Sequence, residues 1–483
     1  MPIRILSLLT LLDAAAIGEA KQLSAFAHNS IWLSLSSGLW TLQHHAAPQF
    51  GLFSQYAELR WIDSSWGFGV LVATTYKLLG LRALPVLLMC FKALFSAMAF
   101  LLAGGLCNSF WMAVILSAVA QYAVPGLGPG ALSISIILFG VEVILLVESR
   151  KTGSLRPLFW LPLLFLLWAN LHIQFVNGLL VLVLFAVVVV VESYASKFAA
   201  FRISNNHRAL PGAKVAAVVF LSGIATLITP YGYRVYQTVP QDVFDVSFSS
   251  NFAEVHYLEF RRPADYLLVL LPMAALFALG RRRSSDLFGI GLLLSGILLA
   301  FRSQRDVWLI VLPSIGIIPE ALGGETHEER FGPNRRWLVP SSTAALAVLL
   351  LVVAAGSWIP ASQLSLLDKA GKNQPVHACD FIRQQRLPTP IFNDYNWGDF
   401  LSFYLPEYPV VADSRVSLYG QTRFGSYIKE ITGQQSLDAD PMFRNANTIL
   451  VMRPSDLGAY LSSRADYRKV YSDNLSLVLL KAR

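Results

Sequence analysis

The feature that most constrains this chain is a series of long apolar runs spread over its first 359 residues. A helix needs about 20 mostly apolar residues to cross roughly 30 Å of hydrocarbon, and shorter runs suffice where neighbouring helices cover them. The sequence therefore predicts a mainly α-helical, polytopic membrane domain of about eleven spans. We place these spans near 3–20, 66–81, 83–104, 129–147, 157–171, 173–192, 214–230, 265–280, 286–301, 307–322 and 337–358. The apolar run 109–124, which ends before a Pro/Gly-rich segment, is predicted to enter the membrane without crossing it fully.

Composition excludes other broad classes of protein. Charged residues make up 14% of the chain, against about 25% in soluble domains, and hydrophobic residues make up 55%. The net charge of +8 is divided among short clusters between apolar runs. This distribution is typical of membrane-protein loops, so neither nucleic-acid binding nor a soluble enzyme is predicted. The three cysteines have no spacing typical of a metal site or a redox pair.

The positions of the basic clusters predict the orientation of the spans. Lys and Arg concentrate in cytoplasmic loops, and three loops are clearly basic, near 150–156, 197–208 and 281–283. If these face the cytoplasm, the loop 231–264, the segment 302–306 and the C-terminus lie outside the cell membrane.

The composition changes after Pro360. Residues 360–483 hold 14 Lys/Arg and 12 Asp/Glu, whereas the preceding 359 residues hold 24 and 18. We therefore predict two parts: a transmembrane domain, 1–359, with an outer loop at 21–65, and an extracytoplasmic α/β domain, 360–483. In the second part the hydrophobic periodicity predicts helices near 376–386, 397–404, 422–431 and 455–463, and strands at 390–393, 408–412, 448–452, 467–472 and 475–480. The last two strands are expected to form a hairpin, and Asn396 is the expected N-cap of its helix.

The outer loop 21–65 carries the first candidate catalytic residues, Glu58 and Asp63. A carboxylate at the outer membrane face could act as a general base or bind a metal ion. Alternatively the loop serves as an interfacial anchor, because Trp and Tyr gather at the headgroup level. Asp63 lies between Trp61 and Trp66, where a span begins, and both interpretations stay open for it.

Polar residues at the outer ends of later spans form a second candidate group. Asn170 and His172 lie in a run of amides and a histidine between two spans, and Tyr231 follows another span. Such side chains are costly in lipid, so they face protein or a water-filled cavity. Arg302 and Arg305 lie on the face opposite to the predicted cytoplasmic side. They could bind a phosphate or pyrophosphate, or they could pair with Asp306 or anionic lipid.

Three pieces of the sequence together resemble a known family. They are the loop from Trp32 through Pro48 to Trp66, the pair Trp168-Ala-Asn-Leu-His172 and Pro230-Tyr-Gly232, and the tail motifs Phe392-Asn-Asp-Tyr-Asn-Trp-Gly398, Asp413-Ser-Arg415 and Leu418-Tyr-Gly420. In these the chain resembles a large group of bacterial multi-spanning proteins related to the GT-C glycosyltransferases. The resemblance covers nearly the whole chain, and the tail motifs are its most specific part.

The resemblance implies an inner-membrane protein of the cell envelope with its active site on the outer face. It also implies a polyprenyl-phosphate-linked sugar as donor and, often, a divalent metal. The stretch Ala27 to Trp32 lacks the carboxylate that such proteins place before the Trp, and Ser65 stands where a second acid usually follows Asp63.

Two further questions stay open in the sequence. Asp413 and Arg415 could bind a sugar or a peptide, or could pair with each other and fix the loops. The whole chain could be a transferase, a transferase with impaired catalysis, or a non-enzymatic scaffold for glycan assembly. A transporter is a weaker alternative, because no inverted repeat is visible.

Overall fold

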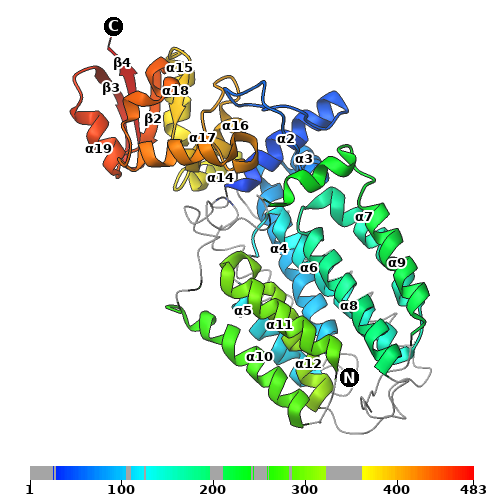
Figure 1. The fold of residues 1–483 in the computed structure, drawn as a ribbon. Coiled ribbons are helices and arrows are strands. Elements are labelled where there is room, and N and C mark those ends of the chain that lie inside the picture. The colour runs from blue at the N-terminus through cyan, green and yellow to red at the C-terminus, as the bar shows by residue number, and fades with distance from the viewer. Residues whose placement is uncertain are drawn as a thin grey trace. The chain divides into compact units, whose positions relative to one another are not determined.

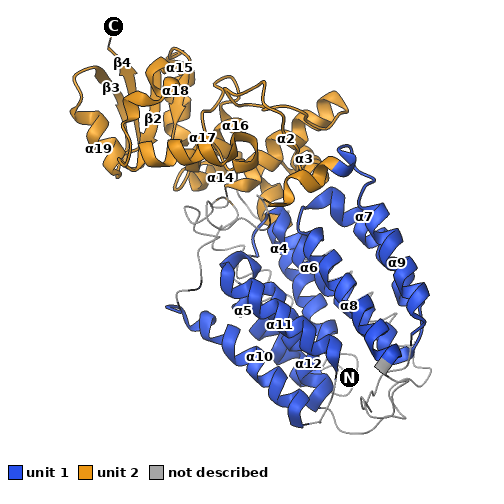
Figure 2. Ribbon diagram, in the orientation of Figure 1, with its two compact units in different colours: residues 1–22, 88–233, 245–356 blue, residues 23–87, 234–244, 357–483 orange. Residues whose placement is uncertain are grey.

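The computed structural model describes residues 29–104, 110–124, 127–195, 210–240, 260–281, 286–322 and 362–482, together with Phe26, Val243 and Leu258. The chain divides into two compact units, whose elements Figure 1 labels and Figure 2 colours separately. The first unit contains residues 1–22, 88–233 and 245–356, and the second contains residues 23–87, 234–244 and 357–483. The predicted spans 3–20 and 337–358 lie outside the described residues.

The first unit is helical throughout its described part. Its helices are most of α4 (Ala83–Leu102), then α5 (Phe110–Ala123), α6 (Ala131–Thr152), α7 (Leu161–Leu171), α8 (Phe175–Ala195), α9 (Gly212–Ala225), α10 (Pro263–Arg281), α11 (Leu287–Arg302) and α12 (Trp308–Leu322). Four helical segments of the described chain are long and apolar enough to cross a membrane: 66–102, 131–152, 175–194 and 263–281. Four shorter apolar helices accompany them, and the total of about eleven spans stays a prediction.

Large apolar side chains point outward from this unit. Phe220, Phe277 and Leu298 are 68%, 70% and 75% exposed. Water would penalise so much apolar surface, whereas hydrocarbon does not. The exposed apolar surface therefore agrees with helices that face lipid.

Gly178 is a point of close approach inside the helical unit. A Cβ atom built there would lie 2.5 Å from Cζ3 of Trp168 and 2.7 Å from Oε2 of Glu142. Both of these side chains are fully buried, so neither can move aside freely. The missing side chain of Gly178 thus lets α8 pack against α6 and α7.

We expect Gly178→Ala to lower the free energy of unfolding by about 1–3 kcal/mol, the usual effect of overpacking. Gly223→Ala is the matched control, because a Cβ on that helical glycine meets nothing within 4 Å. Thermal unfolding of both variants in the same detergent would measure the difference, and equal melting temperatures would contradict the expected clash.

The second unit joins the tail to residues that we expected to form the outer loop. Residues Ser30–His44 form helix α2, not a loop, because an apolar face that includes Trp32 and Leu35 is buried. The Trp32 ring packs against Phe400 and Phe403 of the tail, with centroids 5.1 and 5.3 Å apart. A buried ring in α2 therefore contributes to the core of the tail.

A four-stranded sheet of order β1-β2-β4-β3 organises the tail. The strands are β1 (Ile391–Asn393), β2 (Thr448–Met452), β3 (Tyr467–Ser472) and β4 (Ser476–Lys481). β1 pairs with β2 in parallel, Phe392 opposite Ile449, and the other pairs are antiparallel. The predicted β3–β4 hairpin is confirmed, and β2 has the predicted bounds. The helices of this unit are α2, α3 (Trp66–Leu79), α14 (Gln363–Ala370), α15 (Val376–Gln384), α16 (Tyr395–Tyr404), α17 (Val416–Ile431), α18 (Pro441–Asn445) and α19 (Asp456–Ser463).

Two local predictions in the tail were wrong. Residues 408–412 form no strand beyond one parallel bridge between Ser54 and Val410. The Asn393 side chain takes the place of strand pairing there, since it accepts from Val411 N–H at 2.8 Å and donates to the Ala412 carbonyl at 2.8 Å. The N-cap of α16 is Asp394, whose carboxylate accepts from the N–H of Asn396, and not Asn396 itself.

Candidate functional site

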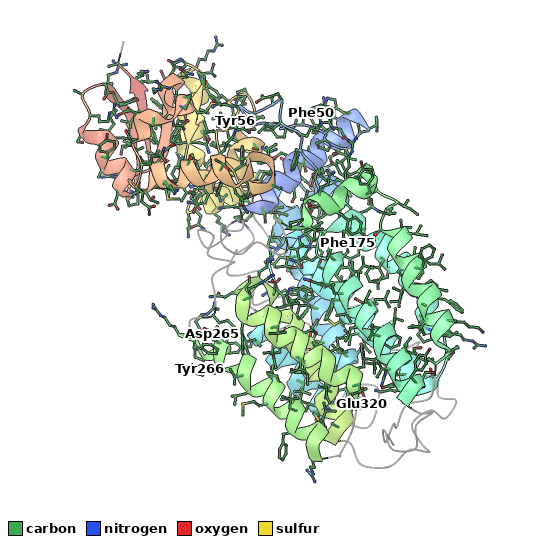
Figure 3. All side chains as sticks on the ribbon, viewed as in Figure 1. Phe50, Tyr56, Phe175, Asp265, Tyr266 and Glu320 are labelled. Carbon is green, nitrogen blue, oxygen red and sulfur yellow. The ribbon has the colours of Figure 1, made fainter. Side chains whose placement is uncertain are left out.

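One set of predicted site residues lies at one end of the helical unit. Figure 3 shows Phe175 and Asp265, which begin α8 and α10, away from Glu320 near the end of α12. His172, Asn170 and Arg305 lie in turns or helix ends near the start of α8. We call the residues described in the next three paragraphs the helix-end cluster.

His172 ends α7 and is held by a chain of hydrogen bonds. Its Nδ1 lies 2.8 Å from Oγ of Ser135 on α6, and that oxygen accepts from Nε1 of Trp168 at 2.7 Å. Since the hydroxyl accepts from the indole, it can donate its hydrogen to Nδ1, and this favours a ring protonated on Nε2. Burial and the nearby Arg305 cation lower the pKa of His172 to about 3, so the ring is neutral.

Arg302 and Arg305 share one carboxylate. Arg305 Nε lies 3.3 Å from Asp306 Oδ1, and Arg302 Nη2 lies 3.9 Å from Asp306 Oδ2. Asp306 is only 2% exposed, whereas the two guanidinium side chains are 32% and 19% exposed. The structure therefore shows the internal pairing with Asp306 that the sequence left open.

Neighbouring turns complete the cluster. Nη2 of Arg262 donates to Asp265 and to Oε1 of Gln304, each at 3.0 Å, and so connects α10 to the turn after α11. The Asn170 amide donates to the Ile228 carbonyl at 2.9 Å. Tyr231 is buried and donates from its backbone N–H to the Thr229 hydroxyl at 3.3 Å.

Sequence reasoning missed Ser135 and Arg262. Ser135 stands inside an apolar span, and a lone serine there is an ordinary helix residue. Arg262 lies in the predicted outer loop 231–264, where its role depends on contacts across the sequence. Only its position on the predicted outer face could have indicated a special role.

Asp63 and Glu58 belong to the second unit. Asp63 is 8% exposed, its Oδ1 accepts from Ser65 N–H at 3.1 Å, and its Oδ2 is among the buried side-chain atoms with no hydrogen bond within the described residues. Burial raises the pKa of Asp63, an effect that hydrogen bonding to Ser37 and Ser65 and the Arg415 cation partly offset. Glu58 is exposed on a turn. Of the two predicted carboxylates, only Asp63 therefore has the environment of a tuned base.

The tail motifs surround a buried ion pair beside this loop. Arg415 Nε lies 3.0 Å from both carboxylate oxygens of Asp413. Burial and the Asp413 charge raise the pKa of Asp399 to about 7. A Cβ on Gly398 would lie 2.6 Å from the Asp413 Cβ, so the glycine of the motif permits α16 to approach this pair.

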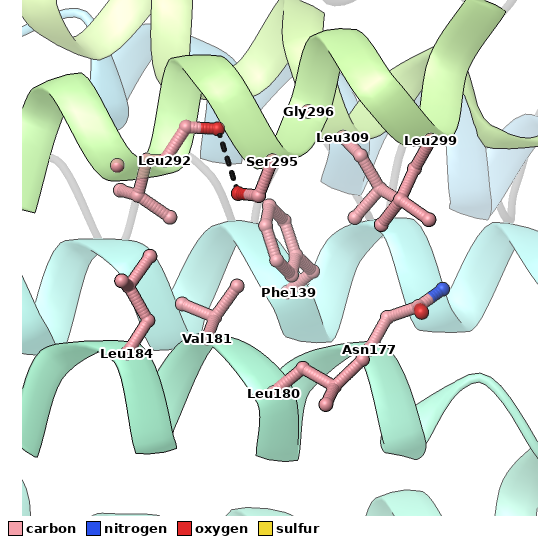
Figure 4. A pocket seen from close by; sticks show the side chains of 11 residues that line it. Phe139, Asn177, Leu180, Val181, Leu184, Leu292, Ser295, Gly296, Leu299 and Leu309 are labelled. Atoms are coloured by element: carbon pink, nitrogen blue, oxygen red, sulfur yellow. Dashed lines mark hydrogen bonds between the residues drawn. The ribbon is translucent and has the colours of Figure 1, made fainter. Parts of the chain in front are cut away.

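The helical unit also contains an apolar cavity of about 180 Å³, shown in Figure 4. Phe139, Val181, Leu292 and Leu309 contribute to its walls, which come from α6, α8, α11 and α12. Asn177 supplies a polar group at its edge, and the Ser295 hydroxyl donates to the Leu292 carbonyl at 3.1 Å. Such a lining suits a hydrocarbon chain rather than a polar ligand.

The described residues do not fit a metal centre. Within them, no three His, Cys, Asp or Glu side chains come together as ligands. Asp63, the carboxylate with the best environment for chemistry, has a permanent cation near it. We therefore derive no step through a metal ion.

The fold is similar to that of known membrane glycosyltransferases of the GT-C class, and the chain is an integral membrane protein. The apo oligosaccharyltransferase from Archaeoglobus fulgidus matches with a TM-score of 0.55 and 11% identity, over 93% of this chain and 69% of that one. The same organism's AglB in complex with an inhibitory peptide and a dolichol-phosphate gives 0.52 and 11%, over 88% and 65%. This chain thus spans about two thirds of the length of these proteins.

A third similar structure is ArnT from Cupriavidus metallidurans bound to undecaprenyl phosphate, with a TM-score of 0.48 and 14% identity over 93% of this chain and 92% of that one. No family model matches the sequence, and no curated protein matches it either. The two Archaeoglobus matches confirm, as a fold, the predicted helical GT-C-like architecture, and the tail contains the predicted small sheet.

Proposed function

We propose that this protein is a membrane glycosyltransferase of the GT-C kind that transfers a sugar from a polyprenyl-phosphate-linked donor at the outer face of a bacterial inner membrane. The observation that carries the proposal is the pair of partly exposed guanidinium groups of Arg302 and Arg305 beside neutral His172. Two neighbouring guanidinium groups suit a phosphate, which arginine recognises well. The AglB structure with dolichol-phosphate supports the same class of ligand.

The proposed reaction is a displacement at the anomeric carbon. A hydroxyl or amide of the acceptor forms the new bond to that carbon, and the bond from the carbon to the phosphate oxygen breaks. The phosphate leaves with the electron pair, and Arg302 and Arg305 stabilise its charge. A general base must take the proton of the acceptor, and from its surroundings within the second unit we propose Asp63 for this role.

The cavity beside Asn177 supports a lipid-linked donor as well. Its apolar walls would accept part of an isoprenoid chain, while a phosphate needs the helix-end cluster. The proposed topology, with the C-terminus outside, follows from basic residues such as Lys151 and Arg156 at the other ends of the spans.

The test is binding of radiolabelled undecaprenyl phosphate to the full chain in lipid nanodiscs. Arg305→Gln is expected to weaken binding about tenfold to a hundredfold, because a hydrogen bond to a charged group contributes about 1.5–3 kcal/mol. Arg302 remains in this variant, so Asp306 keeps a partner. Arg156→Gln, which removes an exposed cation of the predicted cytoplasmic side, is the control and should bind like the wild type.

Equal binding by Arg305→Gln and the wild type would contradict the proposed phosphate site. Binding without sugar transfer from any polyprenyl-linked donor would favour the non-enzymatic scaffold, in which the same cluster merely holds a lipid phosphate.

A further inference from the structure

Arg415 is buried in the tail and has more contacts than its ion pair requires. Its side chain is 3% exposed, and Nε and Nη2 both donate to Asp413. One carboxylate would satisfy a structural pair. The remaining donor and the flat face of the guanidinium contact residues of the outer loop.

Two contacts join Arg415 to that loop. Nη1 donates to the Leu52 carbonyl at 2.8 Å, and the guanidinium carbon lies 4.6 Å from the centre of the Trp61 ring. The first is a charge-assisted hydrogen bond, and the second is a cation–π contact away from bulk water. One side chain of the tail thus holds both ends of the segment 52–61.

The backbone of the same segment is tied to the tail. Gln55 N–H donates to the Val410 carbonyl, and Val410 N–H donates to the Phe53 carbonyl, both at 2.9 Å. These bonds hold residues 53–55 against the tail. Near residue 61, the contact between Arg415 and Trp61 connects the segment to the tail. Asp63 follows two residues after Trp61.

We propose that Arg415 is the positioning residue for Asp63, because it holds the loop segment 52–61 against the tail and puts a permanent positive charge near the Asp63 carboxylate. This inference rests on the proposed function, in which Asp63 activates the acceptor. It assigns the tail motif Asp413-Ser-Arg415 a role in the chemistry of the loop.

The charge environment agrees with this role. The Arg415 cation favours the ionised form of Asp63, against the effect of burial. Around Arg415 itself stand Asp413, Asp399 and Tyr419, and around Asp63 stand the Ser37 and Ser65 donors. Only a cation at this position offsets burial through charge, since the serines act by hydrogen bonding.

The experiment compares Arg415→Gln and Arg415→Lys in the full chain, in detergent, by two readouts that need no substrate. The first is hydrogen exchange of the amides of residues 52–61. In both variants we expect these amides to exchange about ten to a hundred times faster, because the segment loses a hydrogen bond to a charged group. The second is the pH dependence of carbodiimide labelling of Asp63, read by peptide mass spectrometry. Its midpoint should move to higher pH in Arg415→Gln and stay near that of the wild type in Arg415→Lys.

Two further variants are needed, one as a control and one as a substitute for Arg415→Gln. Lys429→Gln changes an exposed cation of the same helix, and it should alter neither readout. Trp61→Leu removes the cation–π contact and leaves the buried ion pair intact. It should speed the exchange of the segment 52–61, and it takes the place of Arg415→Gln if that variant misfolds. The inference is overturned if Arg415→Gln, folded by its melting curve, keeps both the exchange rates and the labelling midpoint. Because neither readout uses sugar transfer, such a failure differs from a failure of the proposed function, which would show as full transfer activity in Asp63→Asn.

Discussion

Asp63→Asn is expected to lower the rate of sugar transfer by about 10²–10⁴-fold, the usual effect of removing a general base. Asparagine keeps the size of the side chain and can still accept from Ser65 N–H, so the start of α3 should be preserved. Glu58→Gln is the matched control. It removes a carboxylate of the same loop that is exposed, and it should leave the rate unchanged.

The pH profile gives a second check on Asp63. Burial raises its pKa, so the acid limb of the rate should lie at higher pH than an ordinary aspartate would give, and Asp63→Asn should lack that limb. The free energy of unfolding depends on pH in the direction opposite to that for a salt-bridged aspartate. Between the unfolded and the raised folded pKa, the unfolded chain has already released the proton, so the wild type loses stability relative to Asp63→Asn as pH rises. Unchanged transfer and an unchanged limb in the variant would exclude Asp63 as the base.

The sequence was sufficient for features that depend on local pattern. The apolar periodicity predicted α6, α8 and α11 within a few residues, and the strand-like runs at 448–452 and 467–472 predicted β2 and β3. The residues Asp473 and Asn474 predicted the hairpin turn between β3 and β4. In the structure the Asp473 carboxylate accepts from the N–H groups of Leu475 and Ser476 and so stabilises this turn. These signals arise within about ten residues of chain.

Features that depend on distant contacts were not predictable in the same way. We predicted a loop where helix α2 forms, because the apolar face of this helix is buried against Phe400 and Phe403 of the tail. The segment 408–412 has the composition of a strand, but the Asn393 side chain replaces its pairing. Such outcomes depend on residues more than ten positions away.

The candidate site divides in the same manner. Arg302, Arg305 and His172 were found because charged or polar residues between apolar spans are costly. Ser135, which holds the His172 ring, was not found, and the contact of Arg415 with the Asp63 loop was not predicted, since their partners lie 37 and 363 residues away. The sequence thus indicated the groups that could do chemistry, and the structure added the groups that orient them.

The largest stability effect is expected at Arg150, on α6 in the helical unit. This side chain was predicted to be a loop cation, but it is 4% exposed and forms a bidentate pair with Glu192 at 2.9 and 3.2 Å. Its Nη2 also lies 3.2 Å from Asp286, which precedes α11. One guanidinium therefore connects the ends of three helices.

Arg150→Gln should lower the free energy of unfolding by about 3–5 kcal/mol, because two carboxylates lose their shared cation in a buried place. Lys151→Gln is the control. Lys151 pairs with Glu320 at 3.2 Å, but both side chains are about one third exposed, and such pairs contribute about 0–1 kcal/mol. Thermal unfolding in one detergent would measure both variants.

A third variant separates the loss of the cation from the loss of packing. Arg150→Met combined with Glu192→Leu and Asp286→Leu removes all three charges and keeps apolar volume, and replacing a buried ion network in this way is often neutral or stabilising. We expect it to recover most of the stability that Arg150→Gln loses. If the triple variant is instead as unstable as Arg150→Gln, the guanidinium contributes mainly through its shape and its stacking on Phe288 at 5.7 Å, and the ion pairs are not what holds these helix ends together.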